Sequence, residues 1–77
     1  MKIIDGVVTI VQESRFQLAD GDGVSHLFVL SYSARAEADQ LTDLQRRQAR
    51  VRVRYTTARN VIGLVAHSVE LKEPAGI

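Results

Sequence analysis

The side chains best suited to chemistry in this sequence are its two histidines, His26 and His67. A catalytic zinc takes three protein ligands, so two histidines leave its set incomplete. Asp5 or Glu70 is available as a third ligand, but no spacing requires either of them. The chain has no cysteine, no serine in a Gly-x-Ser-x-Gly context and no glycine-rich phosphate loop. We therefore expect no enzymatic activity, no metal and no cofactor.

Two aspartates occur in the segment Asp20-Gly21-Asp22-Gly23, between two apolar runs. Repeated Asp-Gly pairs are typical of a β-hairpin turn, because glycine adopts positive φ without steric cost. The same letters resemble the start of a calcium-binding loop. However, Val24, Ser25 and His26 follow, and the third acid, the central glycine and the final glutamate of such a loop are missing. The segment therefore predicts a turn.

The clearest pattern in the chain is the alternation of arginine with apolar residues from Gln48 to Tyr55. A period of two is typical of a half-buried strand, since successive side chains point to opposite faces. Val51, Val53 and Tyr55 are expected to face a core. Arg50, Arg52 and Arg54 are expected on the other face, roughly 6.6–6.8 Å apart.

The remaining pattern indicates short strands and a single helix. Strands are expected over residues 3–11, 15–19, 24–30 and 61–71, with a break or bulge near Gly6 and a bulge near Gly63. Residues 27–30 are continuously apolar, and both alternating sets of residues are apolar around Val7–Val11, which predicts burial on both faces for part of each strand. From Ala34 to Gln48 helix-forming residues dominate, with Ser33 as the expected N-cap. The apolar stripe of this helix is narrow and suits the end of a small barrel; it comprises Ala34, Ala38, Leu41, Leu44 and Gln45.

The resulting order, β-β-β-α-β-β, predicts an all-β domain with one helix. It is the topology of the OB-fold, a five-stranded Greek-key barrel, which the chain resembles over nearly its whole length. Four segments carry a further resemblance: Gly6-Val7-Val8, Asp22-Gly23, Leu41-Thr42-Asp43-Leu44 and Val51-Arg52-Val53-Arg54-Tyr55. In these segments the chain is similar to small, uncharacterised bacterial OB-fold-like proteins. An SH3-like barrel is the alternative, but it normally lacks so long a helix.

The resemblance implies a binding surface across the second and third strands, flanked by residues 12–15 and 57–60. Arg15 and Arg59 would border this surface, with Gln17 between them. No acid occurs between Asp43 and Glu70, so the second half of the chain is basic. We therefore expect a small non-catalytic module that contacts single-stranded nucleic acid through a basic strand. The expected contact residues are Arg15, Arg50, Arg52, Arg54 and Arg59.

Two observations keep alternatives open. The chain has only four aromatic residues for base stacking, Phe16, Phe28, Tyr32 and Tyr55. Acids on neighbouring strands, such as Glu70, are also able to pair with the arginine row and leave it without a ligand. The alternative function is a protein–protein interaction or self-assembling module with no role in nucleic-acid binding.

Charge is distributed unevenly in a chain whose net charge is only +1. Residues 1–43 contain three basic and seven acidic residues, whereas residues 44–77 contain seven basic and two acidic residues. Such asymmetry marks either an interaction surface or two halves that neutralise each other. With 77 residues the chain predicts one domain over residues 1–72 and a flexible tail over residues 73–77. No signal peptide or membrane span is recognisable, and the expected location is cytoplasmic.

Overall fold

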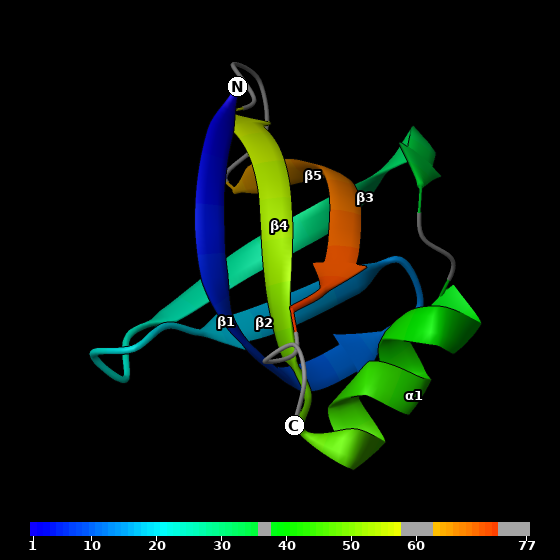
Figure 1. The fold of residues 1–77 in the computed structure, drawn as a ribbon. Coiled ribbons are helices and arrows are strands. Elements are labelled where there is room, and N and C mark those ends of the chain that lie inside the picture. The colour runs from blue at the N-terminus through cyan, green and yellow to red at the C-terminus, as the bar shows by residue number, and fades with distance from the viewer. Residues whose placement is uncertain (36–37, 58–62, 73–77) are drawn as a thin grey trace.

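The computed structural model describes residues 1–35, 38–57 and 63–72, and these residues form a mostly β structure with one helix (Figure 1). The elements are β1 (Lys2–Gln12), β2 (Arg15–Ala19), β3 (Ser25–Arg35), α1 (Ala38–Arg47), β4 (Arg50–Thr57) and β5 (Leu64–Leu71). The strands form a closed barrel in the order β1-β2-β3-β5-β4, with β1 also paired to β4. The β3–β5 pair is parallel, whereas the other pairs are antiparallel. The predicted order β-β-β-α-β-β is confirmed.

Strand β1 pairs with two different strands of the barrel, one along each half of its length. Residues 2–7 pair with β4, and residues from Val7 onward pair with β2. Gly6 lies at this change and is buried. A Cβ atom there would overlap the carbonyl oxygen of Ala19 and lie 3.0 Å from Leu18 Cγ. The expected break or bulge near Gly6 is wrong, because β1 is continuous from Lys2 to Gln12 and its register shift falls between Val8 and Ile10. Gly6 instead allows close approach of two backbones.

The core confirms the predicted alternation of β2 and β4. Val51 and Val53 of β4 are fully buried, as are the side chains of Phe16 and Leu18 in β2. The rings of Phe16 and Phe28 stack with their centroids 5.1 Å apart, and Tyr55 meets Phe28 edge-on at 5.3 Å. Aromatic and β-branched side chains from different strands therefore fill the barrel. The buried cluster comprises Val8, Phe16, Leu18, Phe28, Leu41, Leu44, Val51, Val53, Ala66 and Val69.

Helix α1 covers one end of the barrel beside β1 (Figure 1). Its apolar stripe is buried at Leu41 and Leu44, and Gln45 Nε2 donates a hydrogen bond to the Thr9 carbonyl oxygen at 3.0 Å. After Arg47 the chain leaves the helix at Gln48, whose φ is 50°. A left-handed residue directly after the last turn is a common helix ending.

The expected helix start at Ala34, with Ser33 as its cap, is wrong. Strand β3 continues through Arg35, which pairs with Ser68 of β5, and the helix begins at Ala38. Helix propensity is a weak local preference, and pairing with β5 overrides it here. At the other strand, the expected start at Val61 lies outside the described residues. Gly63, with φ of 139°, precedes β5, and the register shift expected there falls between Arg54 and Tyr55.

Candidate functional site

The arginine row of β4 lies on the outside of the barrel, as the alternation predicts, but most of it is engaged within the chain. Arg52 forms a bidentate ion pair with Asp5 of β1, with Nε–Oδ1 at 2.9 Å and Nη2–Oδ2 at 3.2 Å. Lys72 Nζ contacts the same carboxylate at 2.7 Å. The hydrogen bonds from Arg52 and then from Lys72 hold the pKa of Asp5 well below its usual range. The Asp5 carboxylate in turn raises the pKa of Arg52.

The next arginine of the row, Arg54, is paired with an acid of β5. Its Nε lies 3.4 Å from Glu70 Oε1, and both side chains are about half exposed. The pairing of acidic residues with this row is therefore confirmed for Arg52 and Arg54. Arg50 forms no ion pair with any residue that the structure describes. The positive potential of this face is consequently weaker than three arginines suggest.

The structure does not bring all the predicted contact residues together. Arg15 lies on β2, and β1 separates β2 from β4 in the order of strands. Arg15 is therefore on a different wall of the barrel from Arg50, Arg52 and Arg54. Arg59 lies outside the described residues.

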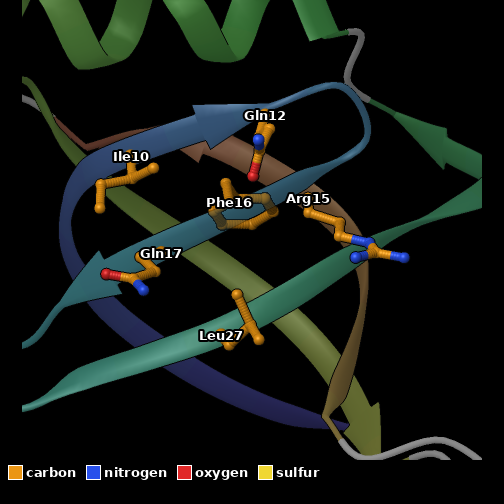
Figure 2. Close-up of a pocket in the computed structure, with 6 residues that line it drawn as sticks. All are labelled: Ile10, Gln12, Arg15, Phe16, Gln17 and Leu27. Carbon is orange, nitrogen blue, oxygen red and sulfur yellow. The ribbon is translucent and has the colours of Figure 1, made fainter.

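We call the outer surface around Arg15 the β2 face, and it contains a shallow pocket. Six residues of β1, β2 and β3 line it, and its volume is about 170 Å³. Figure 2 shows Ile10 at one end and Arg15 at the other, with the Arg15 guanidinium extending across β3. The lining residues are Ile10, Gln12, Arg15, Phe16, Gln17 and Leu27.

Strand register arranges the β2 face as two parallel rows. Ile10 of β1, Gln17 of β2 and Leu27 of β3 are cross-strand neighbours. Arg15, two residues before Gln17 on β2, stands opposite Gln12 on one side and Val29 on the other. The first row therefore places two aliphatic side chains around an amide. The second row places a guanidinium beside an amide.

The exposed aliphatic side chains of this face were not predicted. Ile10 is 50% exposed and Leu27 is 49% exposed, although both lie in runs expected to be covered on both sides. Strand register was the missing information, because Ile10 and Leu27 stand opposite Gln17 and share its outward direction. The alternation of Phe16 and Leu18 inward with Gln17 outward was the available signal in the sequence.

The histidines and aspartates stabilise local structure. Asp20 Oδ1 accepts hydrogen bonds from the backbone N–H groups of Asp22 and Val24, at 2.9 and 3.0 Å. His26 Nε2 lies 2.8 Å from Asp20 Oδ2, and this hydrogen bond, followed by that from Val24, lowers the pKa of Asp20. The predicted turn is thus a hairpin closed by the Asp20 carboxylate.

The second histidine, His67, shares a hydrogen bond of 2.8 Å with Thr56 Oγ1 on β4. Within residues 1–35, 38–57 and 63–72, no three His, Asp or Glu side chains gather in a way that would hold a metal ion. Each histidine thus has a separate hydrogen-bond partner, Asp20 for His26 and Thr56 for His67.

Comparison with known proteins identified no relative. No protein-family model matches the chain, and neither the curated proteins nor the solved structures contain a significant match. The described part of the chain contains no helix that is long and apolar enough to cross a membrane.

Proposed function

We propose that this protein is a non-catalytic OB-fold module that binds another protein through the β2 face. The order β1-β2-β3-β5-β4, the parallel β3–β5 pair and the helix between β3 and β4 support the OB-fold assignment. OB-folds commonly bind their ligands on the face of the second and third strands. The pocket of the β2 face occupies this position.

The observation that carries the proposal is the combination of Ile10 and Leu27 with Arg15. Two half-exposed aliphatic side chains flank a pocket, and Arg15 forms no ion pair with any described residue. Protein interfaces combine an apolar centre with a polar rim, and arginine is enriched in them. The partner is either a different protein or a second copy of this chain.

Site-specific photo-crosslinking in cells tests this proposal. A photoreactive benzoylphenylalanine replaces Leu27 in one variant and Ile3 in the other. The two positions are matched, since Leu27 is 49% and Ile3 is 51% exposed, but Ile3 lies on the β4 side of the barrel, opposite Arg54. We expect protein adducts at position 27 and few at position 3, and the adduct mass identifies a homodimer. Equal labelling at both positions, or none at position 27, would contradict the proposal.

Single-stranded nucleic acid is the second candidate ligand, and two arginines without an ion pair among the described residues favour it. Neither Arg15 nor Arg50 forms an ion pair with a described residue, so both are available to phosphate. The contact set would be Arg15, Arg50, Arg52, Arg54 and Arg59, with the pairs of Arg52 and Arg54 exchanged for phosphates. The lack of exposed aromatic side chains among Phe16 and Phe28, which are both buried, weighs against nucleic-acid binding because bases stack on such side chains.

Anisotropy of a labelled oligothymidine at about 50 and about 200 mM salt tests the second candidate. Each phosphate contact contributes a slope of about −0.7 in log K against log salt. We expect R50Q to reduce the slope by about that amount if this function holds. Binding that is absent at low salt, or independent of salt, rules the second candidate out.

A further inference from the structure

We infer that the β2 face recognises an extended protein segment in which an aliphatic residue and an acidic residue are two positions apart. This inference rests on the proposed function, and it specifies the partner's chemistry. It follows from the two rows of the β2 face, from the pairing of strand β2 and from the Arg15 guanidinium, which forms no ion pair with a described residue.

The first step concerns the backbone of β2. This strand pairs with β1 on one side and with β3 on the other along its whole length. Its peptide groups are therefore engaged, and a ligand cannot join the sheet as an additional strand at this place. Recognition has to occur through the outward side chains of the two rows.

The second step concerns the distance between the rows. Gln17 and Arg15 are two residues apart on β2, which separates their rows by roughly 6.6–6.8 Å. Residues i and i+2 of an extended segment have this same separation and point in the same direction. A segment that runs along β2 therefore places one side chain over each row, in either chain direction.

The third step concerns the chemistry of each row. The Ile10–Gln17–Leu27 row presents half-exposed aliphatic surface, which suits an aliphatic side chain. The other row, Gln12–Arg15–Val29, has Arg15 at its centre. The Arg15 guanidinium suits the two oxygens of a carboxylate, with the Gln12 amide beside it. Figure 2 shows Ile10 and the Arg15 guanidinium at opposite sides of the pocket.

The charge around Arg15 favours a single carboxylate over a polyanion. Glu13 lines a second hollow together with Gln12 and Arg15, so an acid accompanies the cation. A single cation with an acid nearby matches one acidic side chain, whereas a phosphate chain would also meet Glu13. The Ile10–Gln17–Leu27 row contains no aromatic side chain and so gives no stacking surface to bases.

Titration of the isotope-labelled protein with three pentapeptides, followed by NMR, tests the inference. The first two are acetyl-Ser-Leu-Ser-Glu-Ser-amide and its reverse, acetyl-Ser-Glu-Ser-Leu-Ser-amide. The third, acetyl-Ser-Leu-Glu-Ser-Ser-amide, has the same composition, but its acid and leucine are adjacent and point to opposite sides. We expect amide shifts at Arg15, Gln17 and Leu27, with dissociation constants on the order of millimolar.

We expect at least one of the first two peptides to bind about two- to fivefold more tightly than the third, as befits one exposed ion pair. The variant R15Q should abolish that preference, whereas R50Q, on β4, should preserve it. Equal affinities for all three peptides, shifts confined to β4, or stronger shifts of the β2 face by oligothymidine would each overturn the inference. If position 27 still crosslinks to protein in cells, the inference alone fails and the proposed function stands.

Discussion

The substitution Gly6→Ala tests the close approach of β1 and β2 on which the barrel depends. The added methyl group would overlap the carbonyl oxygen of Ala19 and lie 3.0 Å from both the Ala19 carbonyl carbon and Leu18 Cγ. The nearest obstacle is backbone that belongs to the β1–β2 pairing, where Val7 stands opposite Ala19. A backbone atom has no rotamer by which to move away, so the two strands themselves must separate.

The expected destabilisation follows from two opposing effects. Overpacking a well-filled interior costs about 1–3 kcal/mol, and overlap with backbone places this site in the upper part of that range. The alanine also restricts the unfolded chain, which stabilises the protein by about 0.4–1 kcal/mol. The net loss is about 2 kcal/mol. For a domain of this size we expect a decrease in Tm of about 8–16 °C.

Thermal unfolding followed by circular dichroism measures this effect, and Gly21→Ala is the matched control. A Cβ atom on Gly21 would meet no heavy atom within 4 Å, so the same change of residue type carries no clash there. We expect the control to melt within a few degrees of the wild type, since surface changes are usually within about 0.5 kcal/mol. If Gly6→Ala and Gly21→Ala had the same Tm, the close approach of β1 and β2 would be refuted.

Three further predictions concern single side chains. Because the hydrogen bond from Arg52 lowers the pKa of Asp5, the carboxylate stabilises the fold above pH about 4 and loses this effect as the pH falls through the lowered pKa. In urea unfolding, D5N should therefore have a lower free energy of unfolding than the wild type at pH 7, and this difference should disappear in acid. A difference that does not change with pH contradicts the ion pair. The substitution L41A removes a fully buried side chain and should cost about 2–5 kcal/mol in urea unfolding, whereas a loss below about 1 kcal/mol would show that α1 does not close the barrel. D20A removes the acceptor of two backbone N–H groups and should cost about 1 kcal/mol in thermal unfolding, while D22A should be neutral; equal effects would refute the role of Asp20 in the turn.

The arginine row illustrates how sequence and structure divide the description of a surface. Its alternation is local, and the outward direction of Arg52 and Arg54 follows from the strand period alone. Neutralisation of the row depends on Asp5, a residue of β1 that is 47 positions away from Arg52. The amino-acid sequence shows that the acidic first half is able to neutralise the basic second half. The register of β1 against β4 brings Asp5 to Arg52, and the pairing of β4 with β5 brings Glu70 near Arg54.

The sequence by itself determined the features that depend on neighbouring residues. These are the inward Val51 and Val53, the Asp-Gly hairpin, the buried Leu41 and Leu44, and the order β-β-β-α-β-β. In each case a period of two, a period near 3.6 or a turn-forming residue imposes the conformation over a few residues.

The tertiary structure decided the features that depend on pairing between distant strands. The start of α1 moved to Ala38 because β3 remains paired with β5, and Gly6 proved to allow an approach of strands. The half-exposed Ile10 and Leu27 likewise follow from cross-strand register. The polar half of the candidate site, Gln12, Arg15 and Gln17, was therefore predictable. Its apolar half was not, because a continuous apolar run does not reveal which of its side chains the barrel leaves outside.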